Sequence, residues 1–294
     1  MCVASTLLAA CFPNADDLRR GSRPDAGTAS GGRVGAGSGG QIGSGSGGAT
    51  TASGGRSGSG GAAVSTGGYG GDGTALRATG TGWISATSNA FGIQGSWYPY
   101  ADGQGPDGQG QGPCQMGGYP PSACSVLTAP PPGNFFSPSA QGAMCVAGSV
   151  GRVVNNAMGQ PDFDHIWGAG IGFDFADSGG TPPVVGPYNA TAKGIAGIAF
   201  DLDMVPAPGI RVDFLTPTTE NNPASWGGLT LALSPVKVGR NEIRWTEVGG
   251  PNYIAPPPAF DPTRLLSVHF HVPADTASSA TFSFCVSNVA VLTR

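Results

Sequence analysis

The sequence predicts an all-β fold, a single β-sandwich with jelly-roll connections, preceded by a disordered Gly/Ser-rich linker. Short runs of alternating apolar residues recur along residues 83–294, and clusters of Gly, Pro, Asn and Asp separate them. No stretch of the chain has a convincing helical period. Eight or nine short strands within one domain are typical of a sandwich with jelly-roll topology.

The part of the chain before this domain has a different composition. Residues 21–73 contain 22 glycines in 53 positions and no Leu, Phe or Trp. Such a segment cannot bury enough apolar surface to offset its ordering entropy, so we expect a flexible tether that reaches about 40 Å. The predicted organisation is therefore a signal-like segment at 1–11, a disordered linker at 12–82 and a β-sandwich domain at 83–294.

Charge excludes some classes of partner. Charged residues make up 11% of the 294 residues, the net charge is −4, and the few basic residues do not cluster. This argues against nucleic acid or an anionic membrane surface as a partner. No apolar run approaches the 18 residues of a membrane-spanning helix. We expect a monomer.

The start of the chain suggests a lipid anchor. Leu8-Ala9-Ala10-Cys11 resembles a bacterial lipobox, and the resemblance implies cleavage before Cys11 and lipidation of its thiol. The segment departs from a full signal peptide because no Lys or Arg precedes Cys11 and the apolar stretch is short. A chance LAAC in an Ala-rich sequence is the alternative. The lipobox and the tether together predict an exported protein of the bacterial cell envelope, lipid-anchored or extracellular.

Four further cysteines lie in the domain, and an even number in an exported domain predicts two disulfides. Three pairings exist, of which we favour Cys114–Cys124 and Cys145–Cys285. The first pair closes a short loop. In the second pair, each cysteine has the opposite parity to the apolar residues of its own strand, so the two could bridge neighbouring strands. A metal site is the weaker interpretation, because no C-x-x-C spacing occurs.

The alternating runs predict the individual strands. They occupy 91–100, 143–154, 167–176, 195–204, 209–215, 229–233, 241–248, 265–272 and 281–292. In WGAGIGFDF, Trp167 shares its parity with Ala169, Ile171, Phe173 and Phe175, whereas the glycines and Asp174 share the other. One face is therefore bulky and buried, and the other is nearly bare backbone. The dinucleotide-binding glycine fingerprint does not fit, because the third glycine is missing. The last strand changes phase after Val286, which predicts a bulge near 287–288.

The order of these segments carries a resemblance. SWYPYADG, MCVAGSV, WGAGIGFDF, GIAFDLDM, GIRVDFLTP and FSFCVSNVAV follow one another as in the galactose-binding-like jelly rolls, which include carbohydrate-binding modules. The resemblance covers about residues 90–294. It implies a concave sheet that binds glycan and a calcium ion that stabilises loops, although fold alone does not license either activity.

Sugar recognition needs aromatic platforms with polar side chains beside them. The ligand-binding candidates of this kind are Trp226, Trp245, Tyr253, Tyr188, Arg244 and Asp213. Trp97 and Trp167 share parity with apolar neighbours, and we expect both in the core.

The aspartates and the histidines of the domain each suggest a metal site. Asp174, Asp201 and Asp203 belong to the densest acidic set, and clustered carboxylates suit a structural calcium ion. Solvated strand-edge charges are the favoured alternative. His269 and His271 share one strand face and form a potential metal pair with Asp275, but a solvent-facing pair is the favoured interpretation.

Catalysis is the weakest of the functional interpretations. The chain has only three glutamates, and Glu242 and Glu247 have opposite parity, so they would not readily flank a glycosidic bond. No G-x-S-x-G nucleophile elbow occurs. The leading hypothesis is non-catalytic binding of a polysaccharide or surface glycan, and the alternative is a structural or adhesion module without a glycan ligand. A glycan- or metal-dependent enzyme ranks last.

Overall fold

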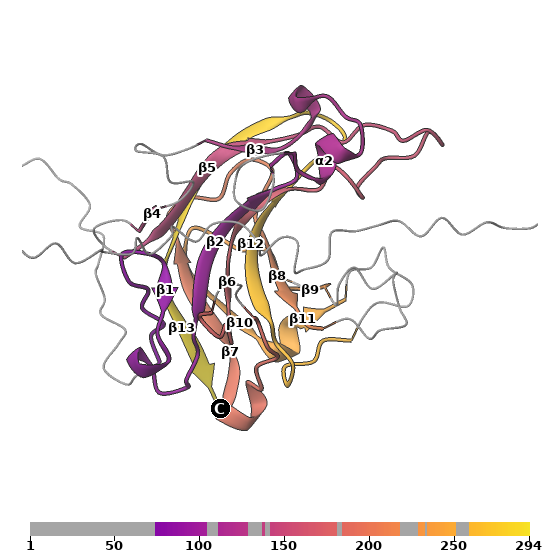
Figure 1. Cartoon of the computed structure of the whole chain (residues 1–294). Coiled ribbons are helices and arrows are strands. Elements are labelled where there is room, and N and C mark those ends of the chain that lie inside the picture. Colours follow the sequence, from indigo (N-terminus) through magenta and orange to yellow (C-terminus); the bar gives the residue numbers. More distant parts are fainter. Residues whose placement is uncertain are drawn as a thin grey trace, which may run out of the picture. The chain divides into compact units, whose positions relative to one another are not determined.

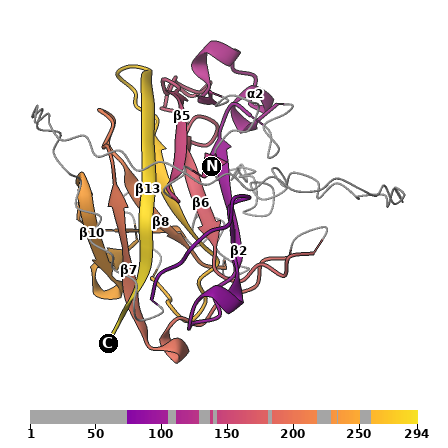
Figure 2. The same cartoon turned by 90° about the vertical axis from the view of Figure 1, so that its left-hand side faces the viewer.

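The structure, a computed structural model, describes residues 74–104, 111–128, 137–138, 142–180, 184–217, 229–232, 234–250 and 259–294. Within these residues the domain consists of two antiparallel β-sheets packed face to face (Figures 1 and 2). The predicted all-β sandwich is confirmed. Strands β5, β6, β7 and β8 alternate between the two sheets, and β12 and β13 each enter the middle of one, which is the connectivity of a jelly roll.

Each sheet is defined by its order of neighbouring strands. The seven-stranded sheet contains, in order, β1 (Trp83–Ile84), β2 (Gly95–Ala101), β6 (Gly168–Asp174), β12 (Ser267–Pro273), β8 (Arg211–Leu215), β9 (Leu229–Ala232) and β11 (Val248–Gly249). The second sheet contains β10 (Gly239–Arg244), β7 (Ile195–Leu202), β13 (Ala280–Thr293), β5 (Met144–Val150) and β3 (Val126–Leu127), with β4 (Ser137–Pro138) also paired to β5. The short helical turns are η1 (Ala86–Ser88), α2 (Pro113–Met116), η2 (Pro121–Ala123), η3 (Thr191–Lys193) and η5 (Trp245–Glu247).

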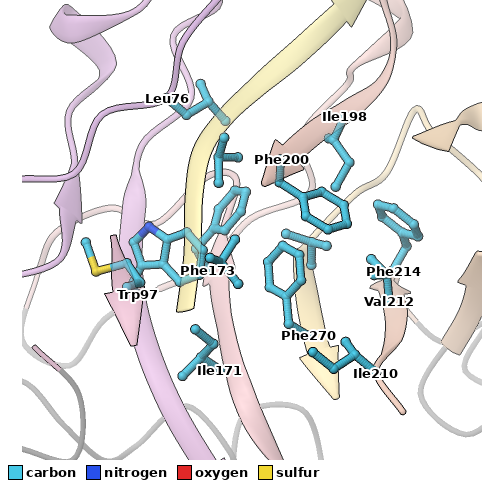
Figure 3. Packing of buried hydrophobic residues seen from close by; sticks show 14 of the residues in the cluster. Leu76, Trp97, Ile171, Phe173, Ile198, Phe200, Ile210, Val212, Phe214 and Phe270 are labelled. Atoms are coloured by element: carbon cyan, nitrogen blue, oxygen red, sulfur yellow. The ribbon is translucent and has the colours of Figure 1, made fainter. Parts of the chain in front are cut away.

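The core lies between the sheets and is built from the strand positions that the alternation predicted. Phe200 of β7 meets Phe270 of β12 across the interface, with ring centroids 4.8 Å apart. Trp97 of β2 packs against Phe173 and Phe270 from its own sheet, as Figure 3 shows. Trp97 is 2% exposed, so its predicted core position is confirmed. Ala169, Ile171, Phe173 and Phe175 are fully buried, as predicted for the bulky side of that strand.

Both predicted disulfides are present. Cys145 of β5 and Cys285 of β13 are direct cross-strand partners with their Cα atoms 4.0 Å apart, on the side of the sheet that faces away from the core. Cys114 and Cys124 are bonded to each other at the end of the sandwich that carries α2, and both are buried. One disulfide therefore joins two long strands, and the other closes a ten-residue loop.

The predicted bulge in the last strand is confirmed. The pairing of β13 with β7 shifts register between Ser287 and Ala290, and Asn288 has a positive φ of 48°. Asn288 donates a side-chain hydrogen bond to Asp201 Oδ2 at 2.8 Å, and its carbonyl accepts one from Arg240 at 3.1 Å. Asp203 Oδ1 accepts the backbone N–H of Cys285 at 2.6 Å. The bulge is thus held by the carboxylates of Asp201 and Asp203 and by the guanidinium of Arg240.

Two boundaries differ from the sequence prediction. Residues 74–82, which the prediction assigned to the linker, belong to the folded unit, because Leu76 is buried and its N–H donates to the Val289 carbonyl at 2.8 Å. The strand predicted at 241–248 ends at Arg244, and a 3₁₀ turn follows. That turn forms because the Glu247 carboxylate accepts the backbone N–H of Arg244 at 2.8 Å. Among the described residues, no helix has the length and apolar character needed to cross a membrane.

Candidate functional site

The outer face of the seven-stranded sheet, the side turned away from the core, carries rows of paired polar and aromatic side chains. The strand registers align Tyr98, Gly172, His269 and Asp213 in one row across β2, β6, β12 and β8. They align Tyr100, Gly170, His271 and Arg211 in the next row. We call the six side chains of these rows the Tyr–His face: Tyr98, Tyr100, Arg211, Asp213, His269 and His271.

The glycines of β6 make this arrangement possible. A Cβ atom at Gly172 would lie 2.5 Å from Cδ2 of His269, and one at Gly170 would lie 2.7 Å from the Tyr100 hydroxyl. The rings from β2 and β12 therefore lie over the bare backbone of β6 and meet above it. The Tyr98 hydroxyl lies 2.8 Å from Nε2 of His269, two strands away. The predicted bare face is present, and side chains of the neighbouring strands occupy it.

This close packing predicts that Gly172→Ala lowers the free energy of unfolding by about 1–3 kcal/mol, because the new methyl group overlaps the His269 ring and the Val268 carbonyl. The measurement is urea denaturation followed by circular dichroism. Gly186→Ala is the matched control, because its Cβ would have no neighbour closer than the Ala176 carbonyl at 4.0 Å. We expect the control to change stability by less than about 0.5 kcal/mol. Equal stability of the two variants would contradict the described packing.

An ion pair closes the Tyr–His face on the β8 side. Arg211 Nε donates to Asp213 Oδ1 at 2.7 Å, and Arg211 Nη2 donates to Oδ2 at 3.0 Å. Asp213 is buried, whereas 29% of the Arg211 side chain is exposed. This bidentate geometry fixes the guanidinium plane beside the Asp213 carboxylate.

The second row contains two groups that stay neutral. Burial lowers the pKa of His271 to about 3, and the nearby Arg211 charge acts in the same direction. Burial also raises the pKa of Tyr100 well above its ordinary value, with the charge of Asp213 as the next cause. The Tyr100 hydroxyl lies 3.5 Å from Nδ1 of His271. At neutral pH this row therefore offers hydrogen-bonding groups without net charge on either ring.

Trp167 belongs to this face, which corrects the prediction that it lies in the core. Gly168 has a φ of 129°, and this interrupts the strand alternation directly after the tryptophan. The half-buried Trp167 ring contacts Tyr100 and His271, each with centroids 5.8 Å apart. Parity alone cannot find this residue, because the change of side depends on the conformation of one glycine.

The two histidines share a strand face, as predicted, but they are buried and do not face solvent. The Tyr100 ring contacts both imidazoles, with centroids 4.8 Å from His269 and 5.9 Å from His271. Nε2 of His271 lies 2.9 Å from the Trp167 carbonyl oxygen and is committed to it as a donor. Asp275, the predicted third ligand, is exposed and lies outside this face. Its backbone forms an isolated β-bridge with that of Arg152.

The sequence-predicted ligand-binding residues do not gather in one place. Of those that the structure describes, only Asp213 belongs to the Tyr–His face. Trp245 packs against Phe214 and Phe260, and its indole N–H donates to the Ile195 carbonyl at 3.0 Å. Tyr188 is buried with its hydroxyl donated to the Phe91 carbonyl at 2.8 Å, and Arg244 is exposed on β10 in the other sheet. Trp226 and Tyr253 lie outside the described residues.

The predicted calcium ligands are not one site, which corrects that hypothesis. Asp174 lies at the end of β6 in the seven-stranded sheet, 3.4 Å from the Tyr98 hydroxyl. Asp201 and Asp203 lie in and after β7 of the other sheet, where they hold the bulge of β13. The core separates the two groups, so their carboxylates cannot share an ion.

One other group of ligand atoms converges among the described residues. Side-chain atoms of Asp102, Cys114 and Cys124 lie within 4.8 Å of one another. The two sulfur atoms are bonded to each other, and the Asp102 carboxylate accepts four hydrogen bonds, from Ser125 N and Oγ and from the backbone N–H groups of Trp167 and Gly168. In the oxidised protein these atoms are engaged within the chain.

Comparison with known proteins gives structural similarity only. No family model and no curated protein sequence matches the chain. The structure is similar to the family 11 carbohydrate-binding module of the cellulosomal cellulase Lic26A-Cel5E of Clostridium thermocellum, with a TM-score of 0.37, 13% identity, and coverage of 67% of this chain and 88% of that one. A solution structure of CtCBM11 matches with a TM-score of 0.28 and 14% identity, over 58% of this chain and 81% of that one.

Proposed function

We propose that this chain is a non-catalytic carbohydrate-binding protein whose ligand lies on the Tyr–His face, with Trp167 as the stacking platform. The observation that carries the proposal is the half-buried Trp167 ring packed on Tyr100 and the neutral His271, whose neighbour in the next strand is Arg211 of the Arg211–Asp213 pair. Aromatic rings stack on the apolar face of a pyranose, and charged or amide groups beside them bind its hydroxyls. The structural similarity to carbohydrate-binding modules agrees with this function but does not carry it.

The polar groups of the face suit hydroxyl recognition. Both carboxylate oxygens of Asp213 are held by Arg211, so the pair is fixed in orientation before a ligand arrives. A preorganised pair loses less side-chain entropy on binding than a free one. The glutamates that the structure describes, Glu242 and Glu247, lie at β10 and in the turn after it, in the opposite sheet. Both described glutamates therefore lie away from the Tyr–His face.

A glycan array run with the full chain, with and without a chelator, tests the proposal. We expect binding to one class of polysaccharide that Trp167→Ala weakens at least about tenfold, the effect of losing a stacking contact worth about 1.4 kcal/mol. Trp245→Phe is the control, because Trp245 packs against Phe214 and Phe260 at the margin of the core and lies outside the Tyr–His face. Glycan binding that survives Trp167→Ala unchanged would place the ligand elsewhere.

A structural or adhesion module without a glycan ligand is the second candidate. Burial of the face favours it, because Tyr98, Tyr100, His269 and His271 are each only 5–6% exposed. Rings buried in this way can stabilise the sheet by packing on one another without binding a ligand. If the folded, disulfide-intact protein bound no glycan on a broad array, the result would support this candidate.

We also propose that the protein is an exported monomer anchored to a membrane through lipidated Cys11. Two disulfides agree with an oxidising compartment outside the cytoplasm. Metabolic labelling with a radioactive fatty acid in a bacterial host tests the anchor. We expect label in the wild-type chain and none in Cys11→Ser, and label retained in Cys11→Ser would contradict the assignment.

A further inference from the structure

Two buried ionisable residues hold the peptide groups on either side of Trp167. Asp102 Oδ2 accepts the N–H of Trp167 at 2.8 Å and the N–H of Gly168 at 2.7 Å. On the other side, Nε2 of His271 donates to the Trp167 carbonyl at 2.9 Å. The N–H of Trp167 is therefore bound by a buried side chain that directly follows β2, and its C=O is bound by a buried side chain of β12 together with the backbone N–H of Ala274.

Each of these two residues is itself fixed. Asp102 Oδ1 accepts the N–H of Ser125 at 2.6 Å, and Oδ2 accepts the Ser125 hydroxyl at 2.9 Å. The Asp102 carbonyl accepts the N–H of Cys114, which ties it to the disulfide loop. The bond to a carbonyl requires a proton on Nε2 of His271, so Nδ1 of the neutral ring is left to accept from the Tyr100 hydroxyl. The tautomer and the ring orientation are thereby set.

The conformation at Gly168 places the Trp167 ring next to these bonds. Its φ of 129° turns Trp167 from the core side to the outer face, and a Cβ there would lie 2.9 Å from Nε2 of His271. At this strand end the Trp167 carbonyl also accepts the backbone N–H of Ala274 at 3.1 Å, and Asp102 and His271 add side-chain hydrogen bonds to the peptide groups around it. The indole then packs on the rings of Tyr100 and His271.

We infer that Asp102 and His271 are positioning residues, which hold the Trp167 peptide so that its indole is presented to a ligand on the Tyr–His face. The inference rests on the proposed function for its consequence, glycan affinity. The geometric part stands without a ligand: loss of either side chain removes hydrogen bonds that restrain the Trp167 peptide, which leaves the indole less tightly oriented.

Fluorine NMR of protein labelled with 5-fluorotryptophan measures that orientation directly, and Trp167→Phe assigns the Trp167 signal. We expect His271→Leu, which removes the donor at similar size, to shift and broaden this signal. His271→Gln keeps an N–H donor and should restore a narrow line. Asp102→Asn should act like His271→Leu, from the opposite side of the peptide. The signals of Trp97 and Trp245, both packed in the core, report whether each variant folds.

Asp203→Asn is the matched control for Asp102→Asn, because Asp203 also binds a backbone N–H but lies on the other sheet. It should leave the Trp167 signal unchanged. On a glycan that the wild type binds, His271→Leu and Asp102→Asn should each lower affinity about tenfold, since a preorganising hydrogen bond is lost. His271→Gln should stay within about twofold.

The two levels of the inference fail separately. An unchanged Trp167 signal in His271→Leu and Asp102→Asn would overturn the positioning role, whatever the protein binds. If His271→Leu does not fold, Asp102→Asn decides the question alone. A released indole in a protein that binds no glycan would overturn the proposed function and the effect on affinity, while the geometric role would stand.

Discussion

Removal of the Cys145–Cys285 disulfide is expected to lower the free energy of unfolding by about 5 kcal/mol. The bond spans 140 residues, so its loss frees nearly half of the chain in the unfolded state. The chain-entropy account gives about 2.7 kcal/mol for the ten-residue loop closed by Cys114–Cys124. The Cys145→Ser/Cys285→Ser variant should therefore unfold at much lower denaturant concentration than Cys114→Ser/Cys124→Ser.

Guanidinium denaturation of the two double variants measures this difference. The register supports the larger effect, because Cys145 and Cys285 already face each other across β5 and β13. If the short-loop variant is the less stable of the two, the loop around α2 contributes more to the fold than chain entropy assigns to it.

The second large effect is a pair of opposite pH dependences. Burial raises the pKa of Asp102 from 3.8 to about 6, and its four hydrogen bonds oppose this shift. The folded state therefore keeps a proton between about pH 4 and 6 that the unfolded state has lost, and the contribution of Asp102 to stability falls as pH rises through this range. The lowered pKa of His271, about 3 instead of 6.5, acts with the opposite sign. Below pH 6.5 the unfolded state binds a proton on His271 that the folded state does not bind. The contribution of His271 to stability therefore rises with pH.

In the wild-type protein the two contributions nearly cancel between pH 4 and 6. Each is worth about 1.4 kcal/mol per pH unit, or about 3 kcal/mol over the range. Relative to wild type, His271→Gln should lose about 3 kcal/mol of stability from pH 4 to pH 6, and Asp102→Asn should gain about as much. Urea denaturation at half-unit pH steps measures both curves.

If the stability difference from wild type changed with pH in the same direction for His271→Gln and Asp102→Asn, the opposite pKa shifts of these two buried groups would be contradicted. The comparison uses differences from wild type, so carboxylates common to all the proteins do not affect it.

Much of the fold could be predicted because strand alternation has a strict period of two wherever one face is buried. The same rule that placed Ile171 and Phe173 in the core placed Phe200 and Leu202 there too. It also found the bulge, because only an extra residue can move Val289 and Val291 onto the core side. The parity of Cys145 and Cys285 then gave the cross-strand disulfide.

The candidate site could be predicted only in part, because it depends on which strands become neighbours. The glycine face of β6 was visible in the sequence, but the tyrosines of β2 lie about 70 residues before it and the histidines of β12 about 100 residues after it. Only the register brings Tyr98 and His269 to opposite sides of Gly172. Trp245 was predicted as a ligand-binding residue, but a 3₁₀ turn after β10 directs its ring against Phe214 and Phe260.

Chemical-shift mapping during a glycan titration tests the central claim most directly. The protein is labelled on tryptophan and histidine side chains, and signals are followed as the best polysaccharide from the array is added. We predict shifts for Trp167, His269 and His271, with Trp245 unchanged. Shifts confined to Trp245, which follows β10 of the other sheet, or a saturating ligand that leaves the Trp167 and histidine signals in place, would contradict a binding site on the Tyr–His face.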